Sequence, residues 1–476
     1  MNAMKRPIIT MPAILIFLMV LVFAPSILMG YQNERNAREA LAAGNQLEAA
    51  RQFELAARRL LWQPELWNEA GRYYSEAGQV LEMIKAYWKA KERNALDACG
   101  WIVLGNFSEH PVEVWQEGLL YYSDAPLLYV GIADYYYRFG DINLEREYVL
   151  DAAKYKEHLT DCSSKMSWDF SITHYRAGLF LMQDDPTHAL EELNTASRLN
   201  SKFAPVVETL RTTLNLASLE DDPVEKLILI GRGLGLAEEW QLAASAFDNA
   251  TQADPESASA WAWLGQAEYQ LGEDGLASFE KAESINPNDS VLLSLRGLYW
   301  QQKNDFESAR QDFEILAQLE PQNPNWQASL GAIYAELGDL PTALAAYEKA
   351  VDLDPAAPIY RQLLALFSFN YRYDMAGMGL SAARRAVILA PEAAEYIDTL
   401  GLLYLGLERN EDAERQFLRA LEKDAEYAAA HFHLGILYLQ RGERELAYSS
   451  LLQAQELASN GVVRADAARL LAEYFQ

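Results

Sequence analysis

The sequence predicts an all-α fold in which helical hairpins stack into a solenoid, preceded by one transmembrane helix. Three observations support this prediction. Prolines recur late in the chain at a nearly constant spacing, Ala, Leu, Glu and Gln fill the stretches between them, and an uncharged apolar run lies near the N-terminus. Those four residue types favour helix over sheet. A chain of 476 residues with 50% hydrophobic content suffices for a long core shared by repeating units.

The apolar run, Ile8–Met29, covers 22 residues without a charged side chain. As a helix it spans about 33 Å, close to the hydrocarbon thickness of a bilayer. Lys5 and Arg6 precede it, so the positive-inside bias places the N-terminus in the cytoplasm and the rest of the chain outside it. We therefore expect residues 1–30 to be an uncleaved signal anchor of a single-pass cell-membrane protein. A signal peptide cleaved within the run remains the alternative.

The later prolines mark an internal repeat. Pro255, Pro287, Pro321, Pro355 and Pro391 are separated by 32, 34, 34 and 36 residues, four steps that sum to four times 34. Small and aromatic residues recur between them in a fixed order. The segment 324–357 carries this set as Leu330, Gly331, Tyr334, Gly338, Ala343, Tyr347, Ala350 and Pro355.

This set resembles the tetratricopeptide repeat, whose pattern W-x2-L-G-x2-Y is followed by A-x3-F and P. The resemblance implies a right-handed α-solenoid. Its units are expected at 224–257, 258–289, 290–323, 324–357, 358–393, 394–427 and 428–461, followed by a capping helix at 462–476. Residues 31–223 match only in part and are expected to form a divergent, repeat-like helical region.

Two of the seven units depart from the pattern. Unit 258–289 is two residues short around Gly272 and Gly275, so its second helix is expected to start late. In unit 358–393, Phe367 occupies the place of the glycine at which the two helices approach each other.

The resemblance also implies a function. A hairpin cannot bury both of its faces alone, and stacking leaves a concave groove lined by the first helix of each unit. In this family such a groove holds a peptide or helix of another protein, so we expect a membrane-tethered interaction scaffold or assembly factor. The expected groove-facing residues are Arg232, Gln266, Tyr269, Gln270, Gln301, Gln302, Asn325, Glu336, Asp398 and Gln440.

A second function stays open at this point. If the signal is cleaved, the chain becomes a secreted or envelope-located solenoid that binds glycans. Tyr135 and Tyr137 flank the expected packing residue Tyr136 and are the candidates for stacking on sugar rings. The partner's identity, the biological process and the oligomeric state cannot be read from the sequence.

Charge and motif content argue against other functions. The net charge of −28 disfavours nucleic acid, which binds to basic surfaces. Gly231, Gly233 and Gly235 lack the Lys-Ser/Thr of a phosphate loop, and His431 and His433 point to different sides of a helix and cannot share a metal. We therefore predict no catalytic site, cofactor or metal.

Acidity is concentrated late in the chain, where residues 224–476 hold 38 acidic and 19 basic side chains. Solvated outer helix faces explain this most simply, and attraction of a basic partner segment is the sharper alternative.

The two cysteines, Cys99 and Cys162, are 63 residues apart and form no metal-binding motif. Burial of each as a small apolar residue is the simpler prediction, and a single disulfide remains the alternative.

Overall fold

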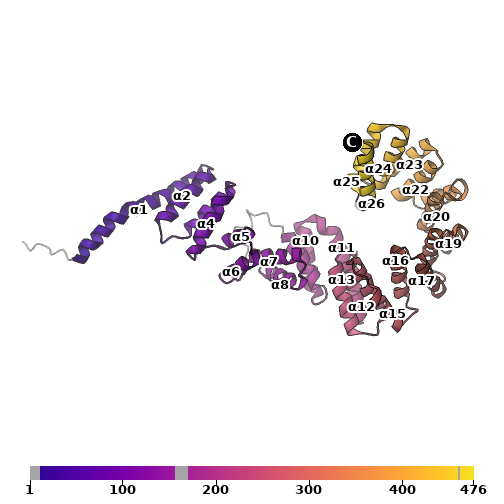
Figure 1. The fold of residues 1–476 in the computed structure, drawn as a ribbon, viewed down its shortest axis with the longest axis horizontal. Helices are drawn as coiled ribbons and strands as arrows, with labels where there is room; N and C mark the ends of the chain where they lie inside the picture. The colour runs from indigo at the N-terminus through magenta and orange to yellow at the C-terminus, as the bar shows by residue number, and fades with distance from the viewer. Residues whose placement is uncertain (1–10, 156–169, 459–460, 476) are drawn as a thin grey trace, which may run out of the picture. The chain divides into compact units, whose positions relative to one another are not determined.

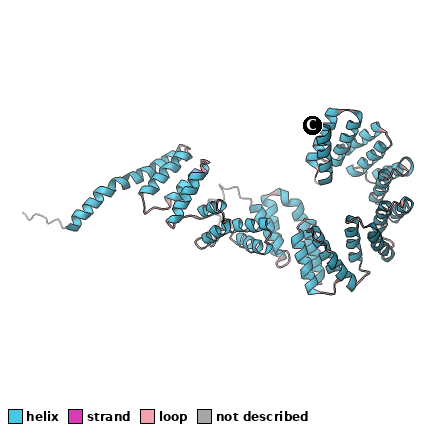
Figure 2. Cartoon of the chain, in the orientation of Figure 1, coloured by secondary structure: helices cyan, strands magenta, loops and turns pink. Residues whose placement is uncertain are grey.

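The structure is helical throughout the residues that it describes. In this computed structural model these are residues 11–155, 170–458 and 461–475, and they contain helices but no strand (Figure 2). Contacts divide the chain into two compact units, Met1–Leu219 and Glu220–Gln476. The prediction of an all-α array of stacked hairpins is confirmed, since each helix packs mainly against its neighbours along the chain.

The first unit is built from successive pairs of helices (Figure 1). They are α1 (Met11–Ala42), α2 (Gln46–Arg59), α3 (Leu66–Glu76), α4 (Val80–Glu92), α5 (Ala98–Asn106), α6 (Pro111–Leu119), α7 (Pro126–Phe139), α8 (Ile142–Lys154), α9 (Phe170–Leu181), α10 (Pro186–Leu199), the 3-10 turn η2 (Ser201–Phe203) and α11 (Ala204–Leu219).

The second unit contains seven hairpins, each made of a first and a second helix, and a closing helix. The helices are α12 (Pro223–Leu236), α13 (Trp240–Ala253), α14 (Ala258–Gln270), α15 (Leu276–Ile285), α16 (Ser290–Gln302), α17 (Phe306–Leu319), α18 (Pro324–Glu336), α19 (Leu340–Leu353), α20 (Pro358–Asn370), the π turn η3 (Met375–Gly379), α21 (Leu380–Leu389), α22 (Ala394–Gly406), α23 (Asn410–Lys423), α24 (Ala428–Arg441), α25 (Arg444–Leu457) and α26 (Gly461–Tyr474).

The predicted membrane anchor is wrong. Within the described residues, no helix combines the length and the apolar character needed to cross a bilayer, and residues 8–10 of the apolar run lie outside them. Residues 11–29 of the run lie in α1, which continues to Ala42 and packs on α2. Ile27 packs against the core of the first unit, and a Cβ on Gly30 would lie 2.7 Å from Leu60. These positions contact the helical array, so the single-pass topology with an extracytoplasmic repeat region is withdrawn.

The prediction for the cysteines also changes. Cys99 lies half-buried on α5 and takes part in a disulfide bond, so it is not a free packing residue. Cys162 lies outside the described residues.

Each regular hairpin of the second unit closes around a glycine on the first helix. A Cβ added to Gly401 would lie 2.5 Å from Cε1 of Phe417, whose side chain is fully buried on α23. Gly231 faces Phe247 in the same way, at 2.4 Å. Because real Cβ atoms do not approach so closely, only glycine lets the ring lie flat on the first helix.

Two irregular hairpins reach the same close approach by other means. Helix α15 starts late, as expected, and has 10 residues where α13 has 14. There Gly275, at φ +70°, comes so close to Gly265 that a Cβ would lie 2.3 Å from the Gly265 carbonyl oxygen. In the hairpin α20–α21, the prediction that Phe367 holds the place of the glycine is wrong, because buried Ala365 occupies the helix position that Gly331 and Gly401 occupy in theirs; Gly379 of η3 packs on Ser368.

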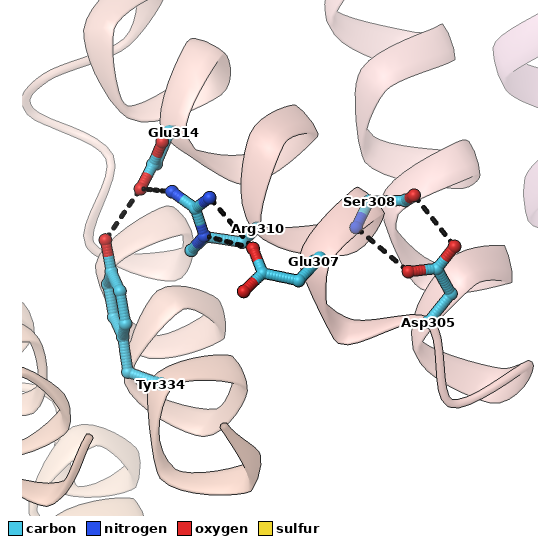
Figure 3. A network of polar contacts seen from close by, with 6 residues as sticks. All are labelled: Asp305, Glu307, Ser308, Arg310, Glu314 and Tyr334. Atoms are coloured by element: carbon cyan, nitrogen blue, oxygen red, sulfur yellow. Dashed lines mark hydrogen bonds and ion pairs between the residues drawn. The ribbon is translucent and has the colours of Figure 1, made fainter. Parts of the chain in front are cut away.

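Tyrosines on several first helices join a hairpin to the one before it. The hydroxyl of Tyr334 on α18 donates to Glu314 Oε1 on α17 at 2.7 Å, and Arg310 bridges Glu314 and Glu307 (Figure 3). Tyr438 on α24 donates to Glu414 on α23 at 2.9 Å. The tyrosine of the repeat therefore fills space and also supplies a polar link between units.

Replacing Gly401 by valine should destabilise the chain by about 2 kcal/mol, because the added carbons displace the buried Phe417 ring. Urea unfolding followed by circular dichroism measures this loss. Gly461→Val is the control, since within the described residues a Cβ at Gly461 meets no atom of another helix within 4 Å, and it should change stability by less than about 0.5 kcal/mol. Equal effects of the two substitutions would contradict the close-packing account.

Tyr334→Phe should cost about 1 kcal/mol at pH 7, the net contribution of one hydrogen bond. Burial opposes ionisation of Glu314, but bonds from Tyr334 and Arg310 outweigh it and lower the pKa of this carboxyl below its ordinary value. A lowered folded-state pKa stabilises the fold above the unfolded pKa and is lost as pH falls through the folded pKa. The cost of Tyr334→Phe should therefore shrink below about pH 4.

The matched control is Tyr448→Phe, because Tyr448 is exposed and its hydroxyl makes no hydrogen bond in the described part of the chain. Chemical unfolding at several pH values tests both variants. A cost for Tyr334→Phe that stays constant down to low pH would contradict the link to ionised Glu314.

Candidate protein-binding surface

Most first helices of the second unit contact the first helix of the next hairpin. Contacts join α12 to α14, α14 to α16, α18 to α20, α20 to α22 and α22 to α24. In Figure 1, α16, α20, α22 and α24 lie on the inner side of the arc that this unit makes, with α17, α19 and α23 outside them. We call the solvent-facing sides of these first helices the inner surface.

All ten residues that the sequence placed in the groove lie on first helices, from α12 to α24. Their exposure differs. The exposed ones are Arg232, Gln270, Gln302, Asn325, Glu336 and Gln440, the half-buried ones are Tyr269 and Gln301, and the buried ones are Gln266 and Asp398.

Several of these side chains are occupied by the next hairpin. Asn325 Oδ1 accepts a hydrogen bond from the Tyr360 hydroxyl, and Glu336 Oε1 accepts one from Tyr371, both at 2.8 Å. Burial and the bond to Glu336 raise the pKa of Tyr371 to about 12, so its hydroxyl stays protonated and donates at neutral pH. These contacts hold neighbouring first helices in register.

Asp398 departs most from the prediction that these polar side chains are exposed in the groove. It is 3% exposed, and its Oδ1 lies 2.8 Å from His433 Nδ1 on α24. Because a buried carboxylate needs a partner, this contact explains why Asp398 faces the next helix and not the solvent. His433 thus has a structural partner.

Aromatic contacts hold two more of the predicted residues. The guanidinium of Arg232 lies 5.2 Å from the centre of the Trp263 ring on α14. The Tyr269 ring meets the Tyr299 ring edge-on, with centroids 5.1 Å apart, and Lys303 Nζ lies over both. The residues predicted to line the groove therefore contact residues of the following hairpin more often than they contact one another.

Sequence reasoning missed the apolar part of the inner surface. Each of the last three first helices carries a set of three residues. The second member lies four positions after the first, and the third lies three positions after the second. These sets are Gln362, Leu366 and Phe369 on α20, Asp398, Leu402 and Leu405 on α22, and Phe432, Ile436 and Leu439 on α24. Residues so spaced share one helix face. Gln362 and Asp398, the first residues of their sets, bond to Thr399 and His433 on the neighbouring first helix at 2.9 and 2.8 Å, and the apolar residues that follow them stay half-buried.

We call the six half-buried residues of these sets the apolar stripe. Its members are Leu366, Phe369, Leu402, Leu405, Ile436 and Leu439. Leu402 and Ile436 are 34 residues apart, as are Leu405 and Leu439. The spacing that aligned the glycines could therefore have revealed part of this stripe.

The unit that carries the inner surface is strongly acidic. Residues 224–476 hold 38 acidic and 19 basic side chains, and Glu220, Asp221 and Asp222 raise the acidic number to 41. The formal charge of Glu220–Gln476 is thus 19 minus 41, or −22. A field of this sign attracts cationic segments and repels nucleic acid.

Residues 229–290, 295–358 and 399–462 match the family model of the tetratricopeptide repeat. These three segments of the chain are similar to tetratricopeptide repeats. The matched segments fall in the second unit, on hairpins that show the glycine contact and the tyrosine links described above.

Two curated proteins share part of this sequence. The chain is 24% identical over 248 residues to anaphase-promoting complex subunit 3 of Schizosaccharomyces pombe, a match covering 49% of this chain and 34% of that protein. It is 33% identical over 94 residues to the Hsp70-Hsp90 organizing protein of Triticum aestivum, covering 19% of this chain and 16% of that protein. The match thus spans about a third of the first relative and less of the second. These matches do not support the prediction of a membrane-anchored repeat protein.

Solved structures of helical repeat proteins are similar as well. Yeast Tom70 is 15% identical with a TM-score of 0.43, and the match covers 93% of this chain and 95% of that one. A tetratricopeptide repeat protein from Parabacteroides merdae is 17% identical with a TM-score of 0.43, covering 52% of this chain and 98% of that one.

Proposed function

We propose that the chain is a protein-interaction scaffold or assembly factor whose inner surface binds a peptide or helix of a partner protein. The apolar stripe is the observation that carries the proposal. Six large apolar side chains on three adjacent helices stay half-buried, although Phe369, Leu402, Leu405 and Leu439 also pack against the core of the second unit. Apolar side chains that line up in this way favour burial against another polypeptide.

The surroundings of the stripe favour a partner segment that is apolar on one side and basic on the other. Gln440 and Glu336 are exposed beside the stripe's helices and can meet polar groups at its rim. The charge of −22 on the second unit raises the rate at which a basic segment encounters this surface.

The relatives support an interaction role without naming the partner. One is a subunit of a multiprotein complex and the other is named for organising Hsp70 and Hsp90. No catalytic role is proposed, and the absence of an active site stays a prediction from the sequence. The glycan-binding alternative is not pursued, because Tyr135 packs on Phe139 at 4.4 Å and the Arg176 guanidinium lies over the Tyr137 ring at 5.0 Å.

Leu402→Glu should weaken partner binding at least about tenfold, because a carboxylate at the centre of the stripe must be buried unpaired in the complex. The test installs a photo-crosslinking residue at Ile436 of the full chain in cells and identifies the adducts by mass spectrometry. We expect one partner to be captured from Ile436 and lost when Leu402→Glu is added.

Leu418 provides the matched control, since this leucine is 44% exposed on the second helix α23. A crosslinker at Leu418 should not capture the same partner, and Leu418→Glu should leave capture from Ile436 unchanged. Equal capture from both positions would refute binding at the inner surface.

A further inference from the structure

The first unit holds a pocket on the side formed by second helices. Its volume is about 490 Å³, and we call it the α2–α4 pocket after the helices that flank it. It is lined by Glu54, Arg58, Trp67, Glu82, Lys85, Ala86, Lys89, Glu92 and Arg93. All of these except Trp67, which lies in the first turn of α3, come from α2, from α4 or from the residue after α4. The pocket is separate from the inner surface, which belongs to the other unit.

Trp67 lines this pocket and carries an unpaired, buried hydrogen-bond donor. Trp67 is only 5% exposed, and its indole Nε1–H has no hydrogen-bond partner within the described residues. Trp115, a buried tryptophan of the same unit, instead donates to the Ile102 carbonyl at 3.2 Å. Since a buried donor left unpaired is costly, an acceptor supplied by a bound molecule would satisfy Trp67.

The charged residues of the pocket leave cations in excess. Arg58 pairs with Glu54, and Lys89 pairs with Glu92 at 2.7 Å. Lys85 and Arg93 are exposed and have no ion-pair partner in the described part of the chain, and Glu82 is the one lining carboxylate that remains. The pocket therefore carries a net positive charge in a chain of net charge −28.

The cations on α4 have a defined spacing, although Lys89 is paired with Glu92. Lys85, Lys89 and Arg93 follow one another at steps of four, so they share one side of α4. Lys85 and Arg93 are separated by about 12 Å along the helix axis. An extended peptide advances about 3.3 Å per residue, so two acidic side chains about four positions apart match this separation.

Exposed apolar side chains lie on the same two helices. Leu81 is 59% exposed and Trp88 is 47% exposed, and both share the face of α4 that carries Lys85. Leu55 on α2 is 36% exposed. An acidic ligand that also carries an apolar side chain would cover more of this surface than a free anion.

We infer that the α2–α4 pocket binds an acidic, partly apolar peptide segment of a partner protein in extended conformation. Its carboxylates pair with Lys85 and Arg93, a main-chain carbonyl accepts the Trp67 indole hydrogen, and an apolar side chain packs on Leu81 and Trp88. This binding site is distinct from the inner surface and calls for a ligand of opposite charge.

The test uses the full chain and a short fluorescein-labelled peptide with two glutamates about four positions apart and a leucine between them. Fluorescence anisotropy measures affinity, and the indole N–H resonance of Trp67, assigned with Trp67→Phe, reports contact with the pocket. We expect the peptide to shift this resonance and to bind more weakly as salt rises. The same peptide with glutamines in place of glutamates should not bind.

The double variant Lys85→Gln, Arg93→Gln should weaken binding about tenfold, and Trp67→Phe about fivefold. The control is Lys281→Gln, Lys349→Gln, which removes two exposed lysines from second helices of the other unit and should leave affinity unchanged. Both cationic pairs are exposed, so folding is preserved.

Three results would overturn the inference. They are an unshifted Trp67 resonance at saturating peptide, equal weakening by the pocket and control double variants, and an equal shift with inorganic phosphate alone. The last would assign the pocket to a small anion.

Discussion

The close approach of two helices within each hairpin is the constraint on which the second unit depends. Gly401 lets the Phe417 ring lie against the first helix, and Gly231 does the same for Phe247. Because the ring is fully enclosed, the first helix has one fixed rotation about its axis. Leu402 and Leu405 follow Gly401 at steps of one and four, so the same rotation fixes the side of α22 on which the apolar stripe lies.

Polar contacts between neighbouring hairpins hold the hairpins together as an array. The bond from Tyr334 to Glu314 joins a first helix to the preceding second helix, whereas the contact of Asp398 with His433 joins two first helices. The polar contacts on the inner surface therefore have two roles, since they keep register and also frame the apolar stripe. An array of this kind is stabilised mainly by nearest neighbours.

Sequence reasoning succeeded where the chemistry is local and repeats. The glycine, the tyrosine and the late start of α15 could be read from one unit and checked on the next. It failed for Asp398, because the partner that buries this residue lies 35 positions away and outside the pattern that defines the repeat. The apolar run near the N-terminus was misjudged because hydropathy does not distinguish an apolar residue that meets lipid from one, such as Ile27, that packs against the core of the first unit. The α2–α4 pocket was out of reach, since Trp67 and Lys85 become neighbours only through packing in the divergent region.

Hydrogen exchange of the full chain carrying Gly401→Val tests the central claim most directly. If the glycine contact fixes each hairpin and neighbours stabilise one another, amides of α22 and α23 should lose protection most. Those of α20, α21, α24 and α25 should lose less, and those of the unit Met1–Leu219 none. A uniform loss of protection across both units, or unchanged protection of α22, would contradict the account.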